Sequence, residues 1–208
     1  MRKPLESPIT YLITRGEATP TNFKEQRHHI LATLRTAAEC GISLVQIREK
    51  LLTTRLLYSL VSEAAAILRP FRTRLLVNDR VDVAVAAGAD GVHLTTRSMP
   101  VEVVRRTFGG DLFIGASTHS LAEASEAARD GADLVVFGPV FATPNKGEPV
   151  GLDGLAEVCR TLAPFPVIGL GGIDDSNFRE VLAAGASGFA AIRFLNDTGL
   201  LNRLANTL

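Results

Sequence analysis

Short apolar runs alternate with longer amphipathic segments along the whole chain. Each run is nearly continuous in Val, Leu, Ile and other apolar residues, which is typical of parallel strands that are covered on both faces. The runs occupy residues 9–13, 44–47, 74–77, 91–94, 112–114, 134–137, 167–170 and 188–192. The other segments have the spacing of amphipathic helices, at residues 24–39, 54–68, 81–87, 101–108, 121–129, 155–162, 177–184 and from Gly199 onward. The pattern therefore predicts a repeated strand–helix unit.

Eight such units in a chain of 208 residues predict a single (β/α)₈ TIM barrel domain over residues 1–208. An open doubly wound sheet has the same alternation, but eight units with no break in composition favour closure. Three predicted helices end in similar turns at Gly88, Gly131 and Gly185, where glycine adopts the positive φ of a helix C-terminus. These turns lead from a helix into a strand, so they lie at the end of the barrel opposite the active site.

The composition excludes several other classes of protein. Lys plus Arg and Asp plus Glu number 22 each, so the formal net charge is zero and no overall field favours nucleic acid or an anionic membrane. No segment approaches the ~20 apolar residues of a membrane span. Cys40 and Cys159 lie far apart in predicted helices, which is typical of a reducing compartment. We expect a cytoplasmic protein; a homo-oligomer is compatible with the sequence, which specifies no oligomeric state.

Amide and cationic side chains mark the end of the second run, where a barrel strand faces the catalytic mouth. Gln46 and Arg48 share one face of the strand because side chains alternate, and Lys50 lies just beyond its end. Burying an amide and a guanidinium inside a small barrel costs free energy unless a partner satisfies them. That partner is either an anionic ligand or an acidic side chain in an ion pair that packs the barrel interior.

The end of the third run offers an amide and a carboxylate on consecutive residues, Asn78 and Asp79. Asp79 has two interpretations. It either caps the helix that begins near Val81, or it joins Asn78 in holding a hard cation such as Mg²⁺.

The fifth run is followed by hydroxyl and imidazole groups at Ser117, Thr118 and His119. Either hydroxyl is a candidate N-cap for the next helix, and both are candidates for ligand contact. His119 is a candidate acid or base because the ordinary pKa of histidine is close to neutral. We interpret His93, inside the fourth run, as a hydrogen-bonded core residue.

The connection at residues 138–147 is long and contains Thr143 and Lys146. Its two prolines stiffen it. The segment is either an ordinary surface loop or a lid that hinges at the glycines at its ends.

Glycine and arginine follow the last two runs. Gly171 and Gly172 precede a helix that is expected to open at Asp174 or Asp175, and Arg193 follows the eighth run. Exposed backbone amides at a glycine turn bind phosphate, and barrels often place a phosphate after these two strands. The sequence therefore predicts a phosphorylated small-molecule ligand.

The order of these motifs resembles the thiamine phosphate synthase and thiazole tautomerase superfamily over nearly the whole chain. The resemblance rests on YLIT at 11–14, VQIREK at 45–50, VNDRVD at 77–82, GADGVHL at 88–94, GASTHS at 115–120, the loop at 138–146 and IGLGGI at 168–173. Several ordered motifs of this length are specific to one superfamily.

The resemblance implies a transferase that joins hydroxymethylpyrimidine diphosphate to thiazole phosphate, giving thiamine phosphate and diphosphate with the help of Mg²⁺. Diphosphate leaves first in this chemistry, and the thiazole nitrogen captures the pyrimidine-methyl cation. The implied catalytic residues are Arg48, Lys50, Ser117, His119 and Lys146. The implied substrate-binding residues are Gln46, Asn78, Thr143, Gly171, Gly172 and Arg193, and the implied metal ligand is Asp79.

The chain departs from the synthase pattern at four strand ends. Ser98 stands where synthases have a second metal aspartate, and Arg193 stands where they have a phosphate-binding serine. Arg15 replaces an aspartate, and Asn145 replaces a threonine. Arginine binds phosphate oxygens without a metal, and Arg97 is a further arginine at the rim. We therefore hypothesise a site that depends less on Mg²⁺, or one that no longer handles a diphosphate.

The resemblance leaves two alternatives to the synthase. A thiazole tautomerase, an isomerase acting on a thiazole carboxylate phosphate, also lacks the metal aspartate, has serine near Ser98 and uses histidine at the position of His119. Asp79 favours the synthase, because tautomerases have glycine there. The second alternative is a non-catalytic protein on the same scaffold that binds thiazole phosphate or thiamine phosphate.

Overall fold

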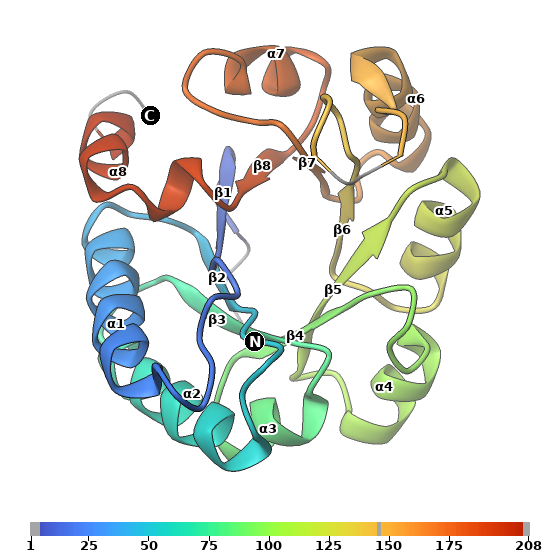
Figure 1. Cartoon of the computed structure of the whole chain (residues 1–208). Helices are drawn as coiled ribbons and strands as arrows, with labels where there is room; N and C mark the ends of the chain where they lie inside the picture. The colour runs from blue at the N-terminus through green and yellow to red at the C-terminus, as the bar shows by residue number, and fades with distance from the viewer. Residues whose placement is uncertain (1–4, 145–146, 206–208) are drawn as a thin grey trace.

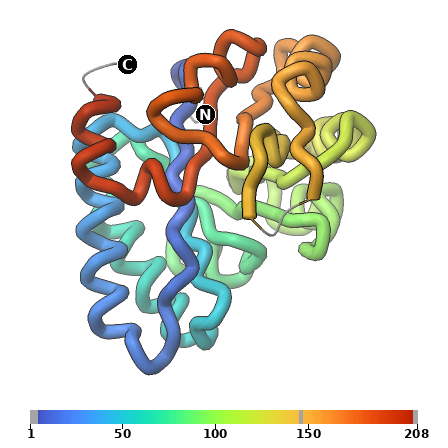
Figure 2. The backbone as a smooth tube through the Cα atoms, turned by 45° about the horizontal axis from the view of Figure 1, so that its top comes forward, coloured from blue at the N-terminus to red at the C-terminus, as the bar shows by residue number. Residues whose placement is uncertain are grey.

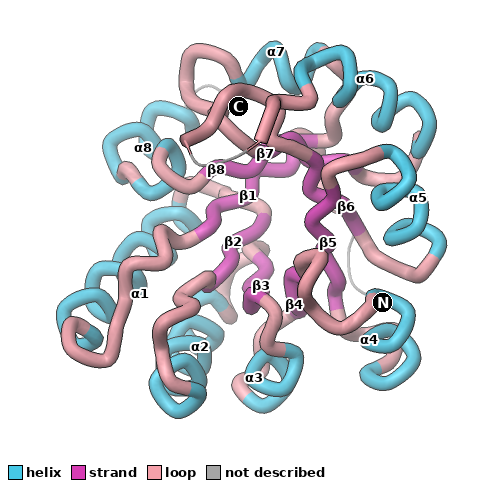
Figure 3. The backbone as a smooth tube through the Cα atoms, turned by 45° about the vertical axis from the view of Figure 1, so that its right-hand side comes forward, coloured by secondary structure: helices cyan, strands magenta, loops and turns pink. Residues whose placement is uncertain are grey.

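Eight parallel strands close into a barrel in chain order, as the sequence predicts. In the computed structural model, which describes residues 5–144 and 147–205, each strand pairs with its neighbours and β8 pairs with β1. The strands form the inner wall and the helices surround them (Figure 1, Figure 3). The strands are β1 Ile9–Ile13, β2 Leu44–Ile47, β3 Arg74–Asn78, β4 Gly91–Leu94, β5 Phe113–Thr118, β6 Leu134–Phe137, β7 Val167–Leu170 and β8 Gly188–Ala191. The helices are α1 Phe23–Glu39, α2 Thr54–Leu68, α3 Val81–Ala86, α4 Val101–Phe108, α5 Leu121–Arg129, α6 Gly151–Leu162, α7 Phe178–Ala183, the 3₁₀ helix η1 Phe194–Asn196 and α8 Thr198–Ala205.

Two boundaries differ most from the prediction, and glycine explains both. β5 continues to Thr118, well beyond the predicted end at residue 114, because Gly115 interrupts the apolar pattern without interrupting the strand. Gly115 pairs with His93 of β4 and with Leu134 of β6. α6 begins at Gly151 rather than at residue 155, and Gly151 has a positive φ of 70° that residues other than glycine rarely adopt.

Alternation along the strands divides the apolar side chains into two cores. One set points into the barrel, and it includes Ile9, Tyr11 and Ile13 of β1 and Leu134 and Val136 of β6. The other set points outward and packs against the helices. Because a strand reverses its side chains at each residue, a polar residue at an inward position near the C-terminal end faces the barrel mouth.

The glycine turns between helices and strands have the predicted geometry. Gly88, Gly131 and Gly185 have φ values of 71°, 98° and 94°, which places all three in the left-handed region. The ring of helices closes where α8 lies beside α1, next to the barrel (Figure 1, Figure 2). Within residues 5–144 and 147–205, no helix is long and apolar enough to cross a membrane.

Candidate active site

The structure gathers most of the predicted site residues around one cavity of about 420 Å³ at the C-terminal ends of the strands. We call it the mouth cavity. Ten of the predicted residues line it: Gln46, Arg48, Lys50, Asn78, Ser117, His119, Thr143, Gly171, Gly172 and Arg193. Asp79 lies next to the cavity without lining it, and Lys146 and Asn145 lie outside the described residues. Polar residues from six strand ends therefore converge on one space that is large enough for small phosphorylated molecules.

Gln46 presents an unsatisfied amide to the mouth cavity. Its side chain is 1% exposed and lies at the end of β2. The amide nitrogen has no hydrogen-bond partner among the residues that the structure describes. A buried amide without a partner costs roughly 1–3 kcal/mol. The strand is thus built with a donor that a ligand in the cavity can satisfy.

Arg48 lies in the cavity wall without a protein counter-ion. No carboxylate of the described residues lies within ion-pair distance of its guanidinium, so the predicted alternative of an internal ion pair is wrong for Arg48. Its backbone N–H donates to the Thr14 hydroxyl (2.9 Å), which joins the ends of β2 and β1. The guanidinium is left to bind an anion in the cavity.

Glu49, which the sequence did not single out, points the other way and holds a loop. It is 3% exposed, and its carboxylate accepts hydrogen bonds from the backbone N–H groups of Gly16 (3.1 Å) and Ala18 (2.8 Å). Alternation along β2 is the signal that separates its role from those of Arg48 and Gln46. Glu49 fixes the loop between β1 and α1 at the rim of the barrel.

Asp79 is held by a cluster of side-chain donors. One carboxylate oxygen accepts from the hydroxyls of Thr95 (3.0 Å) and Ser98, and the other accepts from the Asn78 amide (2.6 Å). Burial raises the pKa of the Asp79 carboxyl, but these hydrogen bonds and the charge of Lys50 outweigh burial and lower the pKa overall. Asp79 therefore stays ionised near neutral pH.

The two predicted roles of Asp79 can be compared with this geometry. Asp79 does not cap α3, because the N-cap position belongs to Arg80 and no side chain accepts a capping hydrogen bond there. The donor set also fits Mg²⁺ poorly, because this ion is usually held by one or two carboxylates whose oxygens are open to it, together with phosphate oxygens and water. Asp79 is a single carboxylate that already accepts three hydrogen bonds, and Ser98 donates to it. Within the described part of the chain, no group of three or more His, Cys, Asp or Glu side chains is placed to hold a metal ion.

A buried polar chain runs beneath the cavity from Tyr11 through His93 to Ser117. The Tyr11 hydroxyl lies 3.2 Å from Nδ1 of His93, and Nε2 lies 2.8 Å from the Ser117 hydroxyl. A Cβ on Gly115 would lie 2.9 Å from Nδ1, so glycine at this position makes room for the ring. The interpretation of His93 as a hydrogen-bonded core residue is confirmed. Its hydrogen bond with Ser117 also links it directly to the site.

The direction of the hydrogen bonds in this chain follows from burial. Burial raises the pKa of the Tyr11 phenol, so Tyr11 keeps its proton. His93 is the one hydrogen-bond partner that the described residues offer to this hydroxyl, so Tyr11 donates to Nδ1. Burial lowers the pKa of His93 to about 4, and the neutral ring then carries its proton on Nε2 and donates to Ser117. The Ser117 O–H is left to donate into the cavity.

The hydroxyls and imidazole of the fifth strand end do not cap the next helix. Ser120, not Ser117 or Thr118, is the N-cap of α5, and it accepts from the Glu123 N–H. Nδ1 of His119 lies 2.5 Å from the Gly138 carbonyl oxygen, so Nδ1 carries a proton and donates. In the neutral ring, Nε2 is then the acceptor that His119 offers at the cavity.

The loop after β6 and the glycine turn after β7 form the opposite wall of the cavity. Val140 and Phe141 donate backbone hydrogen bonds to Leu170 (2.8 Å) and Gly171 (3.0 Å). A Cβ on Gly172 would lie 2.7 Å from Cβ of Phe141, so glycine permits the two segments to pack this closely. The loop is therefore fixed to the glycine turn over its first residues rather than lying free on the surface.

The expected helix at Asp174 or Asp175 begins later, at Phe178. Asp174 and Asn177 form a turn instead, in which Asp174 N–H donates to the Asn177 side chain (2.9 Å) and Ser176 N–H donates to the Asp174 carboxylate (2.9 Å). These side-chain acceptors compete with the helix for the backbone donors. The candidate phosphate contact is therefore the glycine turn itself rather than a helix N-terminus.

Cationic side chains give the mouth cavity its electrostatic character. Arg48, Lys50, Arg97 and Arg193 all line it, and no Asp or Glu is found among its described lining residues. Arg15, the remaining substituted arginine, is exposed and does not belong to this lining. A cavity with several positive charges and no carboxylate attracts anions carrying more than one charge.

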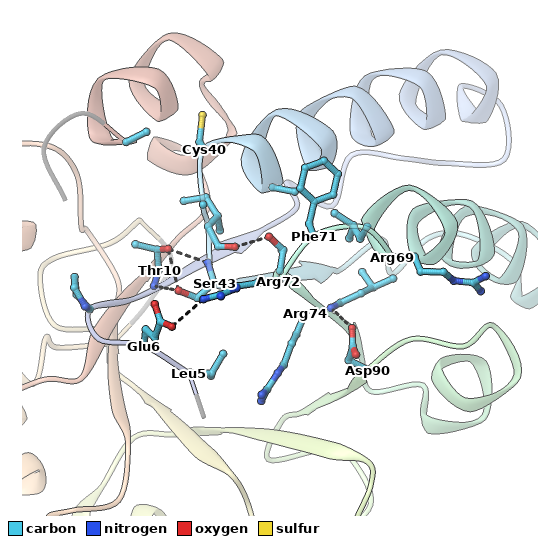
Figure 4. Close-up of a pocket in the computed structure, with 18 of the residues that line it drawn as sticks. Leu5, Glu6, Thr10, Cys40, Ser43, Arg69, Phe71, Arg72, Arg74 and Asp90 are labelled. Atoms are coloured by element: carbon cyan, nitrogen blue, oxygen red, sulfur yellow. Dashed lines mark hydrogen bonds and ion pairs between the residues drawn. The ribbon is translucent and has the colours of Figure 1, made fainter. Parts of the chain in front are cut away.

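A second and larger cavity of about 930 Å³ lies at the opposite end of the barrel. We call it the base cavity. Its polar side chains pair with one another: Arg72 with Glu6 (3.0 Å) and Thr10 with Ser43, while the Thr73 hydroxyl donates to the Ile42 carbonyl (2.7 Å). Figure 4 shows Glu6 turned toward Arg72 and Thr10 turned toward Ser43. None of the predicted site residues that the structure describes lies there.

Comparison with known proteins decides the family. Residues 10–195 match the thiamine monophosphate synthase family. The chain belongs to this family. It is 41% identical over 186 residues to the thiamine-phosphate synthase of Clostridium novyi, covering 83% of this chain and 91% of that one. It is 43% identical over 177 residues to the thiamine-phosphate synthase of Chloroflexus aurantiacus, covering 84% and 81%.

A solved structure agrees with the family assignment. Thiamine phosphate pyrophosphorylase from Pyrococcus furiosus superimposes with a TM-score of 0.79 at 34% sequence identity, over 96% of each chain. The superfamily expected from the sequence is thereby confirmed, together with the barrel fold. The ligand and metal roles of individual residues stay predictions.

Proposed function

We propose that the protein is a thiamine-phosphate synthase, a transferase that joins hydroxymethylpyrimidine diphosphate to thiazole phosphate. The family match and the synthase relatives support this class of reaction. The observation that carries the proposal is the mouth cavity itself, which combines four cationic side chains with an unsatisfied Gln46 amide. The tautomerase alternative lacks such support, since the relatives described above are synthases.

The reaction needs charge stabilisation more than proton transfer. The bond between the pyrimidine methylene carbon and the diphosphate oxygen breaks, and its electron pair leaves with diphosphate. The lone pair of the thiazole nitrogen then forms the new carbon–nitrogen bond, so no proton has to be removed. Cations and hydrogen-bond donors fixed at the leaving group lower such a barrier, and a cavity that lacks carboxylates among its described lining suits this task.

We assign the two substrates to opposite walls of the mouth cavity. Gln46 and Asn78 lie together on the wall formed by β2 and β3, and their amides suit the ring nitrogens and amino group of the pyrimidine. Arg48 lies beside them and takes the diphosphate, with the Ser117 O–H as an uncharged donor. Lys50 and Lys146 are assigned to the same diphosphate from the sequence motif.

The thiazole phosphate is assigned to the wall formed by β7 and β8. The glycine turn at Gly171 and Gly172 offers backbone N–H groups, and Arg193 offers a guanidinium at the next strand end. Thr143 lies in the loop above, where its hydroxyl donates to the Phe141 carbonyl (3.1 Å). His119 lines the cavity beside this loop and contacts the reacting groups without acting as an obligatory base.

The test is turnover by the purified protein with both substrates and with each alone. A synthase forms thiamine phosphate and diphosphate in equal amounts only when both substrates are present, which chromatography and a diphosphate assay measure. Conversion of a thiazole substrate alone would instead establish the tautomerase. Binding of either phosphate without turnover would establish the non-catalytic binding protein.

A further inference from the structure

We propose that this chain neutralises the diphosphate of its substrate with arginine and lysine side chains in place of a divalent cation, and that Asp79 serves to position Arg97 for this task. The inference rests on the proposed synthase function. It gives a role to Arg97, which the sequence left without one. It also assigns Asp79 a positioning role within the protein.

The first step concerns the oxygens of Asp79. All three of the hydrogen bonds that they accept come from neighbouring side chains, and two of the donors, Thr95 and Ser98, belong to the loop between β4 and α4. Asp79 has a positive φ of 59°, the one non-glycine residue of the described chain in this region, and its N–H donates to the His93 carbonyl (2.9 Å). The backbone is thus set so that the carboxylate faces the β4–α4 loop.

The second step concerns the shape of that loop. Thr95 N–H donates to the Ser98 hydroxyl (2.7 Å), and Ser98 N–H donates to the Thr95 carbonyl (2.9 Å), so the segment closes into a tight turn. Both hydroxyls of the turn then donate to Asp79. Arg97 lies between them in sequence and lines the mouth cavity. Asp79 therefore anchors Thr95 and Ser98, and the turn between them presents the Arg97 guanidinium at the cavity.

The third step concerns charge. Arg97, Arg48, Lys50 and Arg193 surround the cavity, and the described lining contains no acidic residue. A guanidinium binds phosphate oxygens through two parallel hydrogen bonds and remains charged at every physiological pH. Mg²⁺ neutralises a diphosphate by the same attraction but needs oxygen ligands from the protein. The chain supplies the cations directly, and the Asp79 carboxylate beside the cavity is engaged by Asn78, Thr95 and Ser98.

The direct test is binding of inorganic diphosphate to the intact protein by isothermal titration calorimetry, in EDTA and in Mg²⁺. We expect binding in EDTA, with Mg²⁺ changing the dissociation constant by less than about threefold. Arg97→Ala should weaken binding in EDTA by about tenfold or more, as expected for loss of a charge-assisted hydrogen bond. Arg35→Ala, which removes an exposed arginine of α1 that does not line the mouth cavity, is the matched control and should change nothing.

A second pair of variants tests the role of Asp79. Ser98→Asp puts a second carboxylate against Asp79 and should create a site for a divalent cation, measured by direct titration with Mn²⁺ and by a new Mg²⁺ requirement for diphosphate binding. Ser98→Ala removes the same hydroxyl without adding charge and should leave binding independent of Mg²⁺. If Ser98→Ala acquires a metal requirement as well, Asp79 is a metal ligand and the positioning role is wrong.

The outcomes separate this inference from the proposed function. If turnover of both substrates stops in EDTA and diphosphate binding is also lost there, the inference is wrong and the proposed synthase function stands. If the protein binds diphosphate in EDTA but turns over the two substrates in no buffer, the proposed synthase function is wrong and the inferred metal-independent diphosphate site stands. Absence of diphosphate binding under both conditions overturns the inference.

Discussion

The two ends of the barrel differ in how their polar groups are satisfied. The base cavity has about twice the volume of the mouth cavity, 930 Å³ against 420 Å³. At the base, Arg72 pairs with Glu6 and the Thr73 hydroxyl with the Ile42 carbonyl. At the mouth, Gln46 has an unpaired amide nitrogen and Arg48 has no carboxylate within ion-pair distance among the described residues. We therefore assign the proposed function to the end that leaves polar groups for a ligand, although its cavity is the smaller one.

The largest expected effect comes from removing one arginine at each end. Arg48→Ala should lower kcat/KM for thiamine phosphate formation by about 10²- to 10³-fold, because a fixed donor to the leaving group is lost. Arg72→Ala removes an exposed arginine whose partner Glu6 is also exposed, so the rate should stay within about twofold. Steady-state kinetics with thermal unfolding of both variants makes the comparison. Equal loss of rate in the two variants would contradict the assignment of the site to the mouth.

The next prediction concerns the pH dependence of stability that His93, beneath the mouth cavity, contributes. Burial lowers the pKa of His93 from 6.5 to about 4, so the folded protein resists protonation where the unfolded chain accepts it. This contribution to stability is fully present above pH 6.5 and is lost as the pH falls toward 4, by about 3 kcal/mol. His93→Gln should flatten the pH dependence of the free energy of unfolding over this interval. Gln46→Leu, which removes a non-titrating side chain from the same cavity, is the control for the loss of a polar group there.

Strand positions could be predicted from the sequence because burial on both faces leaves a continuous apolar run. The prediction failed at β5, where Gly115 makes room for the His93 ring and so has no apolar side chain to signal the strand. A side chain on a neighbouring strand sets the requirement for glycine there. The local sequence pattern cannot reveal this need for glycine, because the His93 ring approaches Gly115 only when β4 and β5 pair in the folded barrel.

Site residues could be predicted where alternation and the strand end determine direction, as for Gln46 and Arg48. The partners of Asp79 could not be predicted, because Thr95 and Ser98 come from a different strand end and meet Asp79 only through the register of β3 with β4. Glu49 was missed for the opposite reason. Its neighbours in sequence face the cavity, but its own carboxylate turns outward to the Gly16 and Ala18 amides.

A smaller effect is expected when one buried hydrogen-bonding side chain is removed at each end of the barrel. Gln46→Leu removes an amide whose nitrogen has no partner, so the free energy of unfolding should rise by about 1 kcal/mol while KM for the pyrimidine substrate rises. Thr73→Val removes a satisfied hydroxyl, so stability should fall by about 1 kcal/mol while the kinetics stay unchanged. Urea denaturation gives both values. A loss of stability in Gln46→Leu would mean that its amide is satisfied in the free protein.

The smallest effect tests the polar chain beneath the cavity. Tyr11→Phe removes the hydroxyl that donates to Nδ1 of His93, at a cost of about 1 kcal/mol in stability for the lost buried hydrogen bond. Without this donor, the His93 proton is free to occupy either nitrogen. In one tautomer, Ser117 must then donate to His93, and its O–H no longer faces the cavity.

The rate is the readout that distinguishes orientation from simple loss of stability. Because about half of the Tyr11→Phe molecules would hold the wrong tautomer if both were equal in energy, kcat should fall by only about twofold. Tyr58→Phe, on the exposed face of α2, should change neither the rate nor the stability. A fall in stability with an unchanged kcat would show that the hydrogen bond between Tyr11 and His93 stabilises the fold but does not orient Ser117. Loss of the rate effect in the double variant Tyr11→Phe with Ser117→Ala would tie the effect to the serine hydroxyl, since a cycle isolates the coupling between two groups.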